Sequence, residues 1–166
     1  MPRRKARGAT TRWLPRGETR QKVEATLEIH RRTVFAIEES GDVVRTVLDD
    51  ALPKLRRVIE RLVDVAEKRE RAAGAIRDLE KTRTAAEHRE DRGAELAELE
   101  NVLRAADTEI SSTFEKLLTL RARVVRVSVE SEGAAQDAGA KLNADLDEMN
   151  LRLDALRSTM SPPYER

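Results

Sequence analysis

Few side chains in this sequence have the type and spacing that catalysis or metal binding requires. The two histidines, His30 and His88, have no second histidine at ligand spacing, and the chain contains no cysteine. Adjacent carboxylates such as Asp49 and Asp50 point about 100° apart on a helix, so they do not form an acid–base pair by themselves. The sequence also lacks a phosphate-binding glycine loop and a nucleophile elbow. We therefore predict that the protein is not an enzyme and has no metal site and no cofactor.

The strongest chemical signal is a cluster of positive charge at the N-terminus. Residues 1–22 contain eight basic residues and one acid, a net charge of +7, and the whole chain is at +1, so the remainder carries −6. We define the arm as residues 1–17 and expect it to be non-helical, because prolines and glycines interrupt it. The predicted partner-binding residues of the arm are Arg3, Arg4, Lys5, Arg7, Arg12, Trp13, Leu14 and Arg16.

Two kinds of partner fit this arm, and a disordered, solubilising tail is a third interpretation. Clustered arginines bind nucleic acid or membrane phosphates because they release counterions from the polyanion. The sequence Trp13-Leu14-Pro15 instead offers an apolar anchor that could dock in a groove on a neighbouring protein subunit. We favour docking on a protein, since an arm that binds only phosphate has no need of these three residues.

The elements that must position the arm follow from a heptad pattern. From Val23 to Ala86 an alternating 4-then-3 spacing continues in one phase, and fifteen of its nineteen positions are apolar. Such a repeat indicates long helices that bury an apolar stripe against other helices. With 38% charged and 2% aromatic residues, the composition is also typical of coiled coils. We predict an all-α fold, an elongated coiled-coil helical hairpin or bundle that carries the basic arm.

Breaks in the pattern divide the chain into segments. The predicted segments are the arm (1–17), a long kinked helix or several helices (18–90), a return helix (94–130), a C-terminal amphipathic helix (138–160) and a tail (161–166). The heptad phase passes unchanged through both Gly41 and Pro53, although each could end a helix. We therefore favour a helix that bends at Pro53, and whether it continues through Gly41 stays open. The alternative at Pro53 is a new helix with the proline in its first turn.

The apolar stripe is wider than two helices need, which predicts further neighbours. Apolar residues spread beyond the two core positions of each heptad in both the long helix and the return helix. The predicted helix-packing interface consists of Val47, Leu52, Leu55, Ile59, Leu62, Val63, Phe114, Leu117 and Leu118. Because one hairpin cannot cover all of them, we predict a homo- or hetero-oligomer or an obligate protein partner.

Taken together, these patterns predict a structural or scaffolding protein. It would self-associate or pack within a filament, a virion or tail particle, or a multisubunit complex, with the arm docked on a neighbour. The alternative is a nucleic-acid-binding protein that uses the arm and oligomerises through its helices. No apolar run approaches the roughly 18–20 residues of a membrane span, so we expect a soluble protein in the cytoplasm or within a macromolecular particle.

Overall fold

The described part of the chain folds into five helices. The computed structural model describes residue 11 and residues 13–81, 89–127 and 132–160. Its helices are α1 (Glu18–Glu38), α2 (Asp42–Leu48), α3 (Ala51–Lys81), α4 (Arg89–Val127) and α5 (Glu132–Thr159). About 91% of the described residues are helical, and none of them is in a strand. The prediction of an all-α fold is confirmed, whereas the tail at 161–166 lies outside the described residues.

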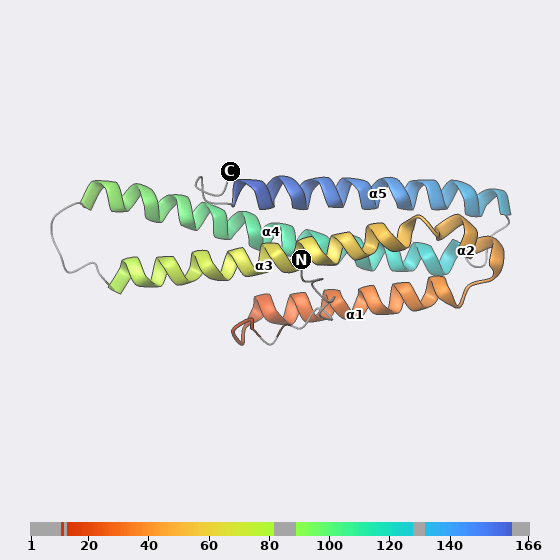
Figure 1. The fold of residues 1–166 in the computed structure, drawn as a ribbon, viewed down its shortest axis with the longest axis horizontal. Coiled ribbons are helices and arrows are strands. Elements are labelled where there is room, and N and C mark those ends of the chain that lie inside the picture. Colours follow the sequence, from red (N-terminus) through yellow and green to blue (C-terminus); the bar gives the residue numbers. More distant parts are fainter. Residues whose placement is uncertain (1–10, 12, 82–88, 128–131, 161–166) are drawn as a thin grey trace, which may run out of the picture.

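The long helices lie along one axis, which makes the molecule elongated (Figure 1). The α3 and α4 helices are antiparallel neighbours, and Arg69 of α3 bonds to Asp107 of α4. The α5 helix runs parallel to α3, since Lys54 contacts Asp147 and, further along both helices, Asp64 contacts Arg157. At one end, α3 and α4 extend beyond α1 and α5 as a two-helix tip (Figure 1).

Residues 18–90 do not form one rod, because the chain reverses direction after α1. Lys22 shares a pocket with Arg69, while His30 lies close to Arg56, so α1 and α3 are antiparallel. Figure 1 shows the same reversal through α2. The favoured helix across Pro53 is wrong: α3 begins at Ala51, and the proline occupies its first turn. There its missing N–H has no helical partner to lose.

The heptad phase survives this reversal because one core receives all three helices. Ile37 of α1, Leu48 of α2 and Leu55 of α3 are each fully buried in the same apolar cluster. The heptad pattern depends on which residues are buried, so its phase stays the same although the backbone turns between these helices. The heptad phase therefore predicts which residues are buried, and it does not predict whether the helix is continuous.

Pro53→Ala tests the position of the proline. Because the first turn of a helix accommodates proline without strain, its ring restricts only the unfolded chain. We expect the substitution to change the free energy of unfolding by less than about 1 kcal/mol, with any change destabilising. A thermal melt measures this difference. A gain approaching the roughly 3 kcal/mol that an interior proline costs would contradict the helix start at Ala51.

The last helix begins earlier than its glycines suggest. The sequence indicates a start at 138, but α5 begins at Glu132 and includes both Gly133 and Gly139. A Cβ atom on Gly139 would lie 2.3 Å from Cγ1 of Val47 and 3.4 Å from the carbonyl oxygen of Val47. Gly139 therefore allows α2 and α5 to approach closely, which is a packing role rather than a helix break.

Salt bridges hold α5 in register on both of its flanks. Towards α3, Lys54 pairs with Asp147 at 2.7 Å and Arg61 pairs with Asp154 at 2.5 Å. Towards α4, the pairs are Lys116 with Glu148, Arg123 with Asp145 and Arg152 with Glu109. Each exposed pair contributes at most about 1 kcal/mol, so their main effect is to select one alignment of the helices.

His30 is a half-buried histidine that the fold keeps neutral. Its Nε2 atom is buried and has no hydrogen-bond partner among the described residues. Burial lowers the pKa of His30 below 6.5, and the positive charges of Arg56 and Arg31 lower it further. A proton that adds to His30 would therefore sit without a partner beside two arginines.

We expect the free energy of unfolding to decrease as the pH falls below about 6.5. The unfolded chain binds a proton at His30 in that range while the folded chain does not, so stability is lost between the ordinary and the lowered pKa. His30→Gln should remove this slope in denaturant titrations at several pH values. Glu24, Glu28 and Glu148 have pKa values below 4.5, so their contribution is lost only at lower pH. An unchanged slope in the glutamine variant would contradict this account.

Candidate partner-binding surface

Thr11 and Leu14, which precede α1, fold back and form hydrogen bonds with side chains of that helix. The hydroxyl of Thr11 donates to Oε1 of Glu24 at 2.6 Å, and the Leu14 N–H donates to the Thr11 carbonyl at 2.9 Å. Arg20 donates to the Leu14 carbonyl at 3.4 Å. Since Leu14 is only 2% exposed and belongs to the core, this non-helical base of the arm has a fixed position on α1.

A carboxylate fixes that attachment. Glu24 accepts hydrogen bonds from both Thr11 and Arg20, at 2.6 Å and 2.8 Å. These bonds lower the pKa of Glu24, the Thr11 bond first and the Arg20 bond second. The side chain is consequently an anion at neutral pH, and its two bonds keep the base of the arm against the helix.

The attachment turns Trp13 outward while Leu14 points into the protein. Trp13 is 42% exposed, and Arg16 is exposed beside it in the sequence. Of the predicted arm residues, Leu14 packs inside its own chain, so its side chain is not available to a partner as the sequence suggested. The residues of the arm that lie outside the described part of the structure are Arg3, Arg4, Lys5, Arg7 and Arg12.

A pocket of about 390 Å³ opens where the arm meets the helices. Arg16 and Gly17 of the arm form one side, and residues from the start of α1, from α3 and from α4 form the rest. Gly17 is the N-cap residue of α1 and provides no side-chain cap. The pocket therefore combines the positive end of a helix with several charged side chains.

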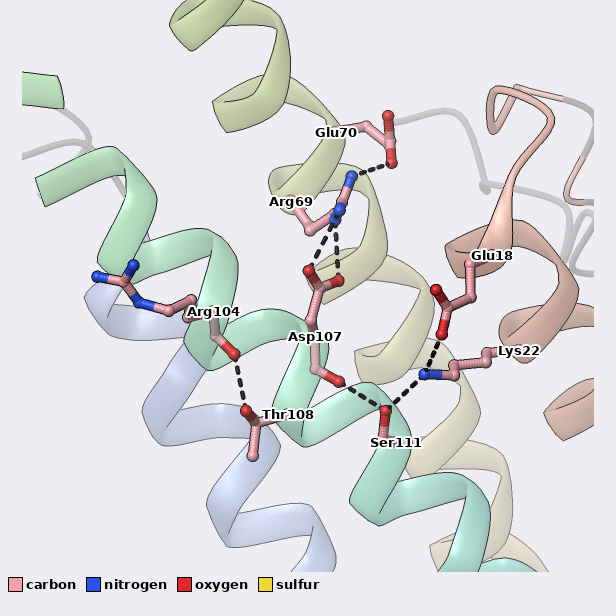
Figure 2. Close-up of polar contacts among 8 residues, drawn as sticks. All are labelled: Glu18, Lys22, Arg69, Glu70, Arg104, Asp107, Thr108 and Ser111. Carbon is pink, nitrogen blue, oxygen red and sulfur yellow. Dashed lines mark hydrogen bonds and ion pairs between the residues drawn. The ribbon is translucent and has the colours of Figure 1, made fainter. Parts of the chain in front are cut away.

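Most charged side chains around this pocket form ion pairs or hydrogen bonds with one another, and these contacts connect α1, α3 and α4 (Figure 2). The Arg69 guanidinium donates to both oxygens of Asp107, at 3.0 Å and 3.2 Å, which raises the pKa of Arg69. Lys22 contacts Glu18 at 2.8 Å and the Ser111 hydroxyl at 3.1 Å. These groups are satisfied by one another, so the network positions α1, α3 and α4, and nothing in it forms a nucleophile–base pair.

The remaining cations give the pocket its chemical preference. Arg16 and Arg77 both line it, both are exposed, and neither has an ion-pair partner among the described residues. Arginine forms forked hydrogen bonds with carboxylates. Arg16 and Arg77 can therefore bind a carboxylate in this pocket, while Trp13 does not line the pocket and is exposed at the base of the arm. Sequence reasoning missed Arg77, because only the fold brings α3 to the arm.

The predicted helix-packing residues lie mainly inside the chain. Leu55, Ile59, Leu62 and Leu117 are buried in the core, Val47, Leu52 and Phe114 pack partly against it, Val63 is half-buried and Leu118 is 42% exposed. The α1 and α5 helices cover the stripe that the sequence left open. The width of the stripe therefore no longer argues for a partner, and self-association needs other support.

Comparison with known proteins adds no functional information. No family model matches the chain, and neither a curated protein nor a solved structure matches it. Within the described residues, no group of three or more acids or histidines could hold a metal ion. No described helix is long and apolar enough to cross a membrane.

Proposed function

We propose that this chain is a structural or scaffolding protein whose arm docks on a neighbouring protein subunit. The observation that carries the proposal is the presentation of Trp13, an exposed aromatic side chain on a backbone that Thr11 and Leu14 fix to α1. Tryptophan and arginine are the residue types that most often dominate binding energy at interfaces. A fixed anchor also loses little conformational freedom when it binds.

The low aromatic content of the chain supports a binding role for the exposed Trp13. Aromatic residues make up 2% of the sequence, and the buried core is built from aliphatic residues, so tryptophan is not used here to fill the interior. The basic residues of the arm and the negative charge of the remaining chain are complementary, which supports a second copy as the neighbour. In this proposal the antiparallel α3 and α4 form a coiled-coil hairpin, and the protein acts in the cytoplasm or inside a macromolecular particle.

The second candidate is a nucleic-acid-binding protein with the helices as its oligomerisation module. It is favoured by the six basic residues of the arm, which has no acid to offset them. Salt separates the two candidates. Phosphate binding weakens steeply with salt, while docking of an apolar anchor is much less sensitive.

Fluorescence of Trp13 tests the proposal, because it is the only tryptophan in the chain. We expect its emission to shift to shorter wavelength as the protein concentration rises, together with a larger particle in light scattering. Trp13→Ala should weaken that association about 30-fold, corresponding to about 2 kcal/mol. Replacing Arg3, Arg4, Lys5 and Arg7 with alanine should have the smaller effect.

Binding of an oligonucleotide and the Trp13 fluorescence series also define the results that would contradict the proposal. A single-stranded oligonucleotide that binds tightly at low salt, is released at high salt and still binds Trp13→Ala would favour the second candidate. An emission that stays unchanged over the whole concentration series, with a particle that remains a monomer, would contradict docking on a second copy.

A further inference from the structure

The turn between α1 and α2 is close to helical geometry. Glu39, which follows α1, has φ −83° and ψ −5°, and Gly41, which precedes α2, has φ −58° and ψ 159°. At Gly41 only ψ is far from the helical value of about −42°. Gly41 is exposed, and a Cβ atom there would meet nothing within 4 Å. We name residues 39–41 the hinge, in which Gly41 needs a rotation about ψ alone to become helical and has open space around its Cα.

The apolar pattern is already suited to a straight α1–α2 helix. Ile37, Val44 and Leu48 are buried in the folded-back chain, and their spacing of seven and four residues places them on one helical face. Straightening the hinge would keep these three residues on a single stripe. The heptad phase that continues through the hinge is thus consistent with two conformations, of which the structure shows one.

The α1 helix has features of an element that can leave its own chain. Its ion pairs Arg20–Glu24, Lys22–Glu18 and Arg32–Glu28 lie within α1 and move with it. Its buried threonines, Thr26 and Thr33, donate to carbonyl groups of α1 itself, at 2.6 Å and 2.8 Å. In contrast, the ion pairs of α5 named above cross to α3 and α4.

Apolar side chains are exposed on both sides of the hinge. Phe35 is 62% exposed before it, and Val43 is 49% exposed after it. When two chains exchange an element, their hinges cross and form a contact that the monomer does not have. Phe35 and Val43 are placed where that contact would form, and this identifies a second copy of the chain as the occupant.

We propose that two copies of this chain exchange α1. In the exchanged dimer the hinge is helical, α1 continues into α2, and each α1 packs on the α3 and α4 of the other chain. The contacts of α1 with α3 and α4 are reproduced between chains, and contacts of the crossing hinges through Phe35 and Val43 replace those of α1 with α2. The inference rests on the proposed scaffolding function and deepens it, because it names the partner and the element that the two copies share.

Chemical cross-linking tests the exchange directly, since the chain has no native cysteine. Lys22 of α1 contacts Ser111 of α4 at 3.1 Å. Separate Lys22→Cys and Ser111→Cys chains are unfolded together, refolded at high concentration and treated with a short bismaleimide. We expect a covalent heterodimer, because only exchanged chains bring the two thiols together. The control is a single chain that carries both Lys22→Cys and Ser111→Cys and is refolded at low concentration. In this monomer the two thiols should be linked within one chain.

Matched hinge variants give the second measurement. Gly41→Ala and Gly41→Pro both fit the φ of −58° in the folded-back chain. Alanine favours the straight helix, so it should raise the dimerisation constant about 5-fold per hinge and about 25-fold for two hinges. Proline disfavours a helical Ser40 before it and should abolish the exchanged dimer. Sedimentation at matched concentrations measures both.

The outcomes separate this inference from the proposed function. A dimer that gives no heterodimer link and that responds equally to both hinge variants would overturn the exchange while leaving self-association intact. A chain that stays monomeric in every variant would overturn the exchange, and the Trp13 fluorescence series would then decide the proposed function by itself.

Discussion

Replacing Ile59 with aspartate is expected to lower the free energy of unfolding by about 3–5 kcal/mol. Ile59 is 5% exposed, and it shares a helical face with Arg56, which lies close to His30 of α1. An aspartate there would place a carboxylate among the apolar side chains of the core, where loss of hydration outweighs what the exposed Arg56 can return. Because small domains have a total stability of about 5–15 kcal/mol, much of the folded population should be lost. Denaturant titration followed by far-UV circular dichroism measures the change.

Val63→Asp is the matched control for this substitution. Val63 lies four residues further along the same side of α3 and is only half-buried, so a carboxylate there keeps access to water. We expect a loss of about 1 kcal/mol. If Ile59 is covered by its own chain, the unfolding midpoint of the variant will not depend on protein concentration. A midpoint that falls on dilution would show that association between chains contributes to stability, as docking of the arm or exchange of α1 requires.

Helical content and core positions could be predicted from the sequence, because both follow from local periodicity. The stripe of Leu55, Leu62 and Leu117 identifies core positions whichever helices surround them. The direction of the chain between elements could not be predicted in the same way. A turn at Gly41 and a bend at Gly41 bury the same residues, so the pattern contains no signal that distinguishes them.

Only some residues of the candidate partner-binding surface could be predicted from the sequence. The arm stands out by its charge, and Trp13 and Arg16 remain at the surface of the described structure. Leu14 was assigned to a partner because an apolar residue among arginines looks exposed, yet it completes the core of its own chain. Arg77 contributes to the pocket from about sixty residues away along the chain, and no local pattern links it to the arm.

Gly139 shows how a tertiary contact overrides a local rule. Glycine costs a helix about 1 kcal/mol relative to alanine, so Gly139→Ala should stabilise an isolated α5. In the folded chain the new methyl group would lie 2.3 Å from Cγ1 of Val47. Val47 is a short, branched side chain that packs against the core, so it cannot move aside freely. Overpacking of this kind costs about 1–3 kcal/mol.

A double-mutant cycle at these two positions is therefore expected to change the sign of one substitution. In the native background, Gly139→Ala should lower the free energy of unfolding, because the clash outweighs the gain in helix propensity. In a Val47→Ala background the obstructing methyl group is gone, and the same substitution should raise stability by about 1 kcal/mol. The coupling energy from the four denaturant titrations should be about 1–3 kcal/mol. Additive effects would mean that α2 does not approach α5 at Gly139, and the early start of α5 would then need another explanation.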